Sequence, residues 1–295
     1  MIKEKRNQQI VLITGCSRGI GYETVELLAF HDFKIYAGVR SINNCKNLRL
    51  LASKKTNIII REIDLRKKSS IQKITKEIKK KEGKIDVIIN NAGAIVFGPI
   101  ETIKQNQFYE QFQINLFGPI LLTQQLVPLM RKERKGLIIF LGSTSGIESH
   151  GMYGAYAASK FALEAICHSL AVNLYPWHIN VSIIELSATA TLMTKKTLKI
   201  GSRLKNGGNP YSNYTKNTLA YLQTLLLNGT SPKKIAKAIL EVIRSPSNKF
   251  RYFATKRSKE AFKKSLKDPT NTKWEKEAKE SLNFYAGCTY PCSNH

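Results

Sequence analysis

The sequence predicts an α/β fold, a doubly wound parallel sheet in three layers (α/β/α), as a single domain with a C-terminal extension. Three observations predict it. Short apolar runs alternate with helical patterns along most of the chain. The apolar runs are continuous and β-branched, which indicates strands buried on both faces by helices. The first run leads directly into a glycine-rich turn at the start of a helix.

Each predicted element follows from a local signal. Residues 10–14 form an apolar run that ends at Gly15, which indicates a buried strand entering a turn. Thr230, Ser231 and Pro232 form a helix cap followed by proline. The predicted strands are residues 10–14, 34–39, 57–63, 85–89, 136–141, 179–184 and 250–254, and the predicted helices are residues 20–30, 69–81, 104–131, 155–174 and 232–243.

Composition bounds the domain organisation. A chain of 295 residues with 42% hydrophobic and 23% charged residues is typical of a globular protein with one large core. We expect one domain over residues 9–254, within which residues 189–229 are polar and irregular. Residues 255–295 lose strand character and are expected to form a basic extension, helical or partly disordered.

The chain is strongly basic, with a formal net charge of +26. The excess is spread along the chain, and its local runs stand where helices are expected to end, which indicates solvated helix termini. We therefore expect no specific nucleic-acid partner. A basic nucleic-acid or membrane-surface protein remains an alternative that rests on charge alone.

The five cysteines form an odd, scattered set, which indicates a reducing compartment without a disulfide framework. Cys288 and Cys292 have no further ligands nearby in the sequence, so no metal site is predicted. The N-terminus lacks a signal-type apolar region, and no apolar run is long enough to span a bilayer. These features predict a cytoplasmic protein without a membrane span.

The turn after the first strand has the spacing G-x-x-x-G-x-G, in Thr14-Gly15-Cys16-Ser17-Arg18-Gly19-Ile20-Gly21. Gly15 allows a tight turn, Gly19 lets the backbone approach a pyrophosphate, and Gly21 lets the helix pack on the strand. The free amides of the helix N-terminus can hold the anion. The loop therefore predicts a dinucleotide site, although a turn that merely needs glycine is the alternative.

The second predicted strand indicates which dinucleotide binds. It carries no acidic residue for the ribose hydroxyls of NAD, and it ends in Arg40. Arg18, in the glycine loop, is a second cation on the same side. Two cations without a carboxylate favour NADP(H) over NAD, unless both arginines are merely solvated.

Tyr156 and Lys160 stand at i and i+4 of the long predicted helix, and therefore on one face. A phenol is a poor acid–base group at neutral pH unless a neighbouring ammonium stabilises its anion. Ser143 lies just beyond the strand predicted at 136–141, where α/β sheets present their ligands, and its hydroxyl can bond a substrate carbonyl. The set predicts acid–base chemistry on a carbonyl or alcohol.

Taken together, these motifs resemble those of the short-chain dehydrogenase/reductase superfamily over residues 9–254, most of all its hydroxysteroid/retinol dehydrogenase-like branch. The resemblance rests on six features in order: the glycine loop, Asp64, Asn90-Asn91-Ala92-Gly93, Asn115, Ser143, and Tyr156-Ala157-Ala158-Ser159-Lys160. It implies a Rossmann fold and an enzyme that acts on CH–OH donors. Such an enzyme transfers a hydride between NADP(H) and the carbonyl/alcohol carbon of a fairly apolar ketone, steroid, retinoid or similar substrate.

The resemblance also implies a role for each site residue. Tyr156 is the acid/base, Lys160 bonds the nicotinamide ribose and assists Tyr156, and Ser143 holds the substrate oxygen. Asn115 positions a water in a proton relay. The implied cofactor-binding residues are Gly15, Ser17, Arg18, Gly19, Ile20, Gly21, Arg40, Asp64, Leu65, Asn91, Ala92, Gly93, Tyr156, Lys160, Thr189 and Thr191, and the substrate-binding residues are Ser143, His150, Tyr153 and Tyr156.

By the same resemblance, residues 189–229 form a substrate lid, and the chain pairs into a homodimer or homotetramer through the helices around Asn115 and Tyr156. One feature departs from the family. Leu186 and Ser187 occupy positions that are usually Pro-Gly, while Thr191 is kept. The departure predicts altered cofactor affinity or loop geometry with the fold unchanged. It also supports the alternative of a dinucleotide-binding sensor or scaffold with weak or lost turnover.

Overall fold

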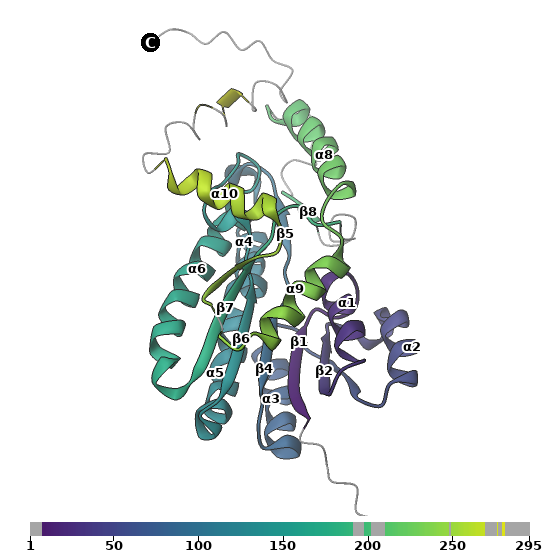
Figure 1. Cartoon of the computed structure of the whole chain (residues 1–295). Coiled ribbons are helices and arrows are strands. Elements are labelled where there is room, and N and C mark those ends of the chain that lie inside the picture. Colours follow the sequence, from purple (N-terminus) through teal and green to yellow (C-terminus); the bar gives the residue numbers. More distant parts are fainter. Residues whose placement is uncertain are drawn as a thin grey trace, which may run out of the picture.

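The protein contains one parallel sheet of seven strands with helices on both faces (Figure 1). The computed structural model describes residues 8–190, 198–201, 210–247 and 249–268, together with 276, 279 and 280. The strand order is β3-β2-β1-β4-β6-β7-β9, and every neighbouring pair is parallel. The predicted doubly wound fold is therefore confirmed.

The seven strands agree closely with those predicted from the apolar runs. They are β1 (Gln9–Thr14), β2 (Phe33–Val39), β3 (Ile58–Glu62), β4 (Val87–Asn90), β6 (Gly136–Leu141), β7 (Ile179–Glu185) and β9 (Arg251–Phe253). Strands such as β6 are buried along their whole length, because helices cover both faces and leave no polar side for alternation.

Two apolar cores lie on opposite faces of the sheet. On one face, α1 (Gly19–Leu28), α2 (Lys46–Lys54) and α9 (Pro232–Arg244) pack against the strands. On the other face lie α3 (Lys68–Glu82), α5 (Gly118–Glu133) and α6 (Gly154–Leu174). Figure 1 shows this sandwich, with α9 beside α1 although the two helices are far apart in the sequence.

The long helix predicted at 104–131 is interrupted. It consists of α4 (Gln105–Phe112), a π-helical turn (Gln113–Phe117) and α5. π-helical turns of this kind are frequent at functional sites, and this one contains the predicted catalytic residue Asn115. Short 3-10 turns occur at Ile42–Asn44, Ile100–Thr102, Thr144–Gly146 and Tyr175–Trp177.

The prediction that residues 189–229 are irregular is wrong for part of that segment. Residues Ser212–Leu227 form helix α8, and Leu198–Ile200 form β8, which pairs with β5 (Ile95–Phe97) in a second, two-stranded sheet. α8 is held by packing, since Leu222 lies in an apolar cluster with Phe97 and Met152. The extension begins with helix α10 (Lys256–Leu266). No helix in the described ranges has the length and apolarity needed to cross a membrane.

We expect Ile239→Ala to lower the free energy of unfolding by about 2–5 kcal/mol, because Ile239 is fully buried between α9 and the sheet. Urea unfolding followed by circular dichroism measures the change. Leu227→Ala, at a position that is 82% exposed, is the matched control and should change stability by less than about 0.5 kcal/mol. Equal effects of the two variants would contradict this packing of α9.

Candidate active site

The predicted site residues gather where the parallel strands end. The glycine loop follows β1, Asn91 follows β4, and Ser143 follows β6. β4 lies between β1 and β6 in the sheet, so these three segments are neighbours. The carboxyl edge of such a sheet is where doubly wound folds bind their ligands.

The glycine loop has the close approach that a dinucleotide cradle needs. Gly15 and Gly19 adopt positive φ values of +75° and +59°, which L-residues rarely adopt. A Cβ on Gly21 would lie 2.4 Å from the carbonyl oxygen of Gly15, so the loop and helix α1 can pack this tightly only with glycine. No side chain caps the start of α1 within the described structure. Its first amides therefore fit a pyrophosphate.

Asn91 fixes the loop from the neighbouring strand. Its amide Nδ2 donates to the carbonyl oxygens of Thr14 at 2.7 Å and Gly15 at 3.3 Å. In return, the Thr14 hydroxyl oxygen accepts from the backbone N–H groups of Asn91 and Ala92. These bonds explain why the Asn91-Ala92-Gly93 segment belongs with the glycine loop.

Both predicted phosphate-binding cations are available for a ligand. Arg18 is half-buried at the start of α1, and Arg40 is exposed directly after β2. Within the described ranges, neither side chain makes a hydrogen bond or an ion pair.

Asp64 is held by a neighbouring arginine. Arg66 donates to its carboxylate from Nε at 2.8 Å and from Nη2 at 2.6 Å, and this guanidinium holds the pKa of Asp64 below its usual value. Arg66 also pairs with Glu110, which in turn pairs with Lys199 of β8. The predicted cofactor residue Asp64 is thereby tied to the two-stranded sheet through Arg66 and Glu110. Leu65 is buried against the start of α5, near Gly118.

Tyr156 and Lys160 lie on the same side of α6, as their spacing predicts. The Lys160 ammonium is 5.9 Å from the centre of the Tyr156 ring. Lys160 is only 9% exposed, and its Nζ donates to the carbonyl oxygen of Leu141, the last residue of β6, at 2.7 Å. That bond uses one of three N–H groups and leaves two for other partners.

Asn115 has a structural role that the sequence analysis did not predict. Its Oδ1 accepts from the Ala94 N–H at 2.9 Å, and its Nδ2 donates to Ala94 O and to Ser159 Oγ, both at 3.1 Å. The Ser159 hydroxyl donates to the carbonyl oxygen of Tyr156 at 2.6 Å. The Asn115 side chain therefore joins the segment after β4 to the first turns of α6.

Ser143 is placed to donate. It is buried, and its Oγ accepts from the Ser145 N–H at 3.1 Å at the start of the 3-10 turn. The described residues provide no acceptor for the Ser143 O–H proton. A carbonyl oxygen on a substrate could accept it.

A buried apolar and aromatic cluster packs beside Tyr156. Tyr153 packs edge-on against Tyr156, with ring centres 6.4 Å apart, and against Phe97 at 5.2 Å. Met152 and Leu222 belong to the same cluster, so β5, the turn before α6 and α8 all contribute to it. His150 is mostly exposed and faces Glu148 at 3.9 Å, which places it at the rim.

Of the two remaining predicted cofactor residues, Thr189 and Thr191, only Thr189 lies in the described part of the chain. Thr189 is buried, and its hydroxyl donates to the carbonyl oxygen of Ser187 at 3.0 Å. Thr191 lies outside the described residues. Nowhere in the described part of the chain do three or more His, Cys, Asp or Glu side chains gather as metal ligands.

Asn90 and a cluster of charged residues behind the site were not predicted from the sequence to have a role. The Asn90 carboxamide is buried at the end of β4, and neither of its polar atoms has a partner in the described structure. Such an orphaned group needs a water or a ligand. The signal in the sequence was a polar residue ending an otherwise apolar strand.

Glu185, Glu164 and Arg251 form a buried cluster behind Ser143. Arg251 donates to Glu164 at 2.7 Å and also to Glu185. A Cβ on Gly142, the residue before Ser143, would lie 2.4 Å from Glu185 Oε2. Burial, followed by the nearby Glu164, raises the pKa of Glu185 to about 9. The raised pKa favours the protonated form of Glu185 at neutral pH.

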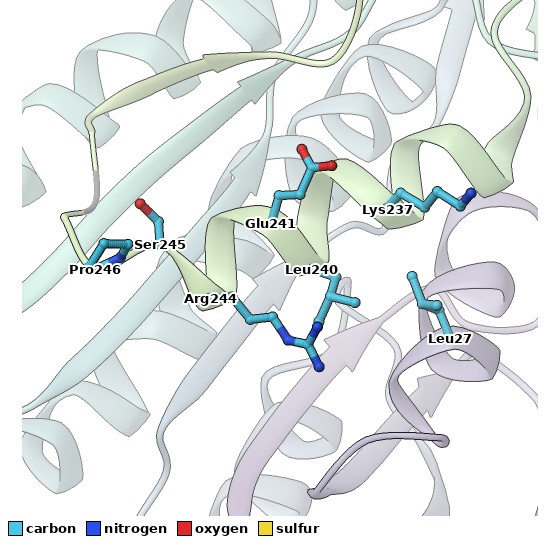
Figure 2. Close-up of a pocket in the computed structure, with 7 residues that line it drawn as sticks. All are labelled: Leu27, Lys237, Leu240, Glu241, Arg244, Ser245 and Pro246. Carbon is cyan, nitrogen blue, oxygen red and sulfur yellow. The ribbon is translucent and has the colours of Figure 1, made fainter.

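A separate cavity lies far from this chemistry. Figure 2 shows its lining residues, among them Leu27, Leu240 and Arg244, on the carboxyl-terminal parts of α1 and α9. Its volume is about 580 Å³. The glycine loop is at the opposite end of α1. None of the predicted site residues lines this cavity.

A doubly wound sheet with a glycine loop after its first strand and a Tyr–Lys pair on a later helix is typical of dinucleotide-dependent oxidoreductases. The model of a protein family described as "short chain dehydrogenase" matches residues 9–200. The chain belongs to the short-chain dehydrogenase/reductase family of NAD(P)-dependent oxidoreductases. The resemblance stated from the motifs is thereby confirmed.

Several characterised relatives match most of the chain. Human 17-beta-hydroxysteroid dehydrogenase type 1 is 28% identical, over 90% of this chain and 83% of the relative. Retinol dehydrogenase 8 of Bos taurus is 31% identical, over 80% and 78%. The 3-ketodihydrosphingosine reductase of Bacteroides thetaiotaomicron is 30% identical, over 82% and 86%.

Solved structures share the fold. A short-chain dehydrogenase from Streptomyces avermitilis superposes with a TM-score of 0.77 at 23% identity, covering 94% of this chain and 99% of that one. A metagenomic short-chain oxidoreductase in complex with NADP gives 0.66 at 21% identity, over 83% and 96%. A Burkholderia phymatum relative in complex with NAD gives 0.77 at 18% identity, over 91% and 95%.

We expect Glu185→Gln to flatten the pH dependence of stability. In the unfolded chain, the Glu185 carboxyl has its usual pKa of 4.5 and loses its proton above that pH, whereas the folded protein keeps the proton. The free energy of unfolding therefore falls as the pH rises from 4.5 to about 9. Glutamine does not titrate, so this contribution to the slope disappears.

Urea unfolding at about pH 5.5, 7 and 8.5 measures the slope for wild type and variant. Glu241→Gln, on the exposed side of α9, makes the same change of residue type outside the cluster and serves as the control. If wild type and Glu185→Gln lose stability equally with rising pH, the protonated state assigned to Glu185 is wrong.

Proposed function

We propose that the chain is an NADP(H)-dependent reductase or dehydrogenase that acts on the carbonyl/alcohol carbon of a fairly apolar substrate. The observation that supports the proposal most directly is the Tyr156–Lys160 pair on α6, with Lys160 bonded to Leu141 at the end of β6, two residues before Ser143. The glycine loop follows β1 at the same edge of the sheet. A scaffold that only held a nucleotide would have no need of a positioned phenol and ammonium.

The glycine loop, the start of α1 and Lys160 are the parts of the chain that would bind the dinucleotide. The glycine loop and the start of α1 would hold the pyrophosphate, and the Lys160 N–H groups would bond the nicotinamide ribose. When bound, the dinucleotide supplies the two electrons and the hydrogen that interconvert a carbonyl and an alcohol.

The protein side chains then donate or accept one proton at the substrate oxygen. The Ser143 hydroxyl donates to that oxygen and orients it. Tyr156 gives a proton to the oxygen during reduction and takes it during oxidation. The buried Lys160 ammonium stabilises the phenolate left behind. A water relay near Asn115 would return the proton from solvent.

NADP(H) preference rests on Arg18 and Arg40. Arg18 lies in the glycine loop and Arg40 directly follows β2, and neither has a partner among the described residues. Both guanidinium groups can therefore donate hydrogen bonds to a 2′-phosphate. The absence of a carboxylate at the end of β2 removes the usual partner of the NAD ribose hydroxyls.

An apolar substrate is supported by Tyr153, which is partly exposed next to Tyr156 and is backed by the buried cluster of Phe97, Met152 and Leu222. α8 contributes to this cluster from within the predicted lid segment. The named relatives act on steroids, retinol or a sphingoid ketone by their names. Ketone, steroid and retinoid substrates are therefore the first to screen.

A homodimer or homotetramer is supported by exposed aromatic residues on the helices around the site. Tyr109, Phe117 and Phe161 are each about half exposed on α4, the π-helical turn and α6. Large apolar groups in such a position favour burial against a second copy. The free thiols of Cys16, Cys45 and Cys167 suit the cytoplasmic compartment proposed from the sequence.

A dinucleotide-binding sensor or scaffold is the second candidate function, favoured by Leu186 and Ser187 in the usual Pro-Gly positions. The two candidates differ in turnover rather than in binding. A purified protein that binds NADPH but reduces none of a broad panel of ketones would favour the sensor.

We expect Tyr156→Phe to lower kcat by about 10²–10⁴-fold, because the variant keeps the ring and loses only the proton donor. NADPH binding, measured by nicotinamide fluorescence, should stay unchanged. Tyr109→Phe on exposed α4 removes a phenolic hydroxyl outside the site and is the control. A Tyr156→Phe enzyme with wild-type turnover would refute the mechanism.

Arg40→Asp should weaken NADPH binding by about tenfold or more, while NADH binding changes little, because only NADPH carries the 2′-phosphate. Arg49→Asp on exposed α2 makes the same charge change away from β2 and should have little effect on either cofactor. Titration of both variants with both cofactors tests the assignment, and equal losses of NADPH and NADH affinity would count against a phosphate contact.

A further inference from the structure

The loop at residues 186–190 leaves β7 at the edge of the candidate cofactor site and is bonded to several elements. The Leu186 carbonyl accepts from the Thr144 N–H at 2.9 Å, which joins the loop to the turn that begins at Ser143. The Ala188 carbonyl accepts from the Thr230 N–H, and the Ala190 N–H donates to the Thr230 carbonyl, both at 2.9 Å. The segment before α9 thus holds the far end of the loop.

Ser187, at the middle of the loop, has a partner in the C-terminal extension. Its Oγ lies 3.1 Å from Thr255 Oγ1, and either hydroxyl can donate. Thr255 is the N-cap of α10, where its Oγ1 accepts from the Ser258 N–H at 3.0 Å. A hydroxyl oxygen has two lone pairs, so the cap and the bond to Ser187 are compatible.

Helix α10 is itself fixed to the core near the site. Phe262 is buried, the Arg251 guanidinium lies 4.7 Å from the centre of its ring, and Phe253 packs edge-on against it at 5.3 Å. Arg251 is the residue that binds Glu164 and Glu185 behind Ser143. The Ala254 N–H also donates to the Glu185 carbonyl, at 3.1 Å. α10 therefore begins on a rigid base.

The Ser187–Thr255 bond is important because Leu186 and Ser187 occupy the positions that are usually Pro-Gly in the family. Proline fixes φ in its loop and glycine permits conformations that serine disfavours, so a Leu-Ser pair lacks the local restraint of Pro-Gly. A hydrogen bond to a fixed helix cap can replace a local restraint with a tertiary one. A Gly or Ala at position 187 has no hydroxyl for such a bond.

We propose that Ser187 is a positioning residue for the dinucleotide, which it serves by tying the 186–190 loop to the N-cap of α10 through Thr255. The proposal rests on the proposed dinucleotide-dependent function. It assigns a purpose to the start of the C-terminal extension, since α10 then becomes part of the support of the cofactor site.

The test compares full-length Ser187→Ala with wild type. The change removes the tether and leaves the Thr255–Ser258 cap in place. We expect NADPH Kd and KM to rise by about three- to tenfold, the worth of one hydrogen bond, with kcat changed by less than about twofold. Ser245→Ala, which removes a half-buried loop hydroxyl before β9, is the control and should match wild type.

A second readout needs no cofactor. Hydrogen exchange measured by mass spectrometry on the protein without dinucleotide should be faster in Ser187→Ala, both at 186–190 and in the first turn of α10. Thr255→Ser keeps the hydroxyl, and it should retain wild-type exchange and NADPH affinity. Faster exchange in these two segments together is the sign of a tether, because a local defect in the loop would leave α10 protected.

The outcomes separate the two proposals. Wild-type protein that binds neither NADPH nor NADH would overturn the proposed function and this inference together. If wild type binds NADPH and Ser187→Ala binds it equally tightly, this inference alone is overturned. Unchanged exchange at the start of α10 in Ser187→Ala, or a Thr255→Ser variant as impaired as Ser187→Ala, would also overturn it.

Discussion

The geometry of the site depends on one buried charge. The Lys160 ammonium is almost fully withdrawn from water, and a charge in such a place is costly unless it is bonded. Its bond to the Leu141 carbonyl ties α6 to the end of β6. Ser143 follows Leu141 by two residues and Tyr156 precedes Lys160 by one helical turn, so this contact links the segment that carries the serine hydroxyl to the helix that carries the phenol.

The groups behind Lys160 preserve that charge. Burial raises the pKa of Glu185 and thereby favours its neutral form, which reduces the negative charge in the cluster behind Lys160. Glu185 Oε2 also lies so close to Gly142 that a Cβ there would be 2.4 Å from it, so the turn before Ser143 packs directly on this carboxyl.

The sequence predicted those parts of the protein whose signal is local. Apolar runs identified all seven strands of the main sheet, and the glycine spacing identified a turn in which Gly15 and Gly19 adopt positive φ and Gly21 leaves no room for a Cβ. Helix α8 was missed because packing of Leu222 against Phe97 and Met152, more than its own pattern, holds it. The Arg251 cluster joins residues 87 positions apart, and no window of sequence contains both ends.

The effect of Leu186 and Ser187 in place of Pro-Gly depends on the structure around the loop as well as on the motif. In isolation, loss of Pro-Gly suggests a loosened loop and a weakened enzyme. In the folded chain, the loop makes four hydrogen bonds to three separate segments: the turn that begins at Ser143, Thr230 and Thr255. A restraint that relatives place within the loop can thus be supplied by its neighbours. The substitution is therefore weak support for a sensor without turnover, because the order of this loop depends on contacts with other segments and not only on its own residues.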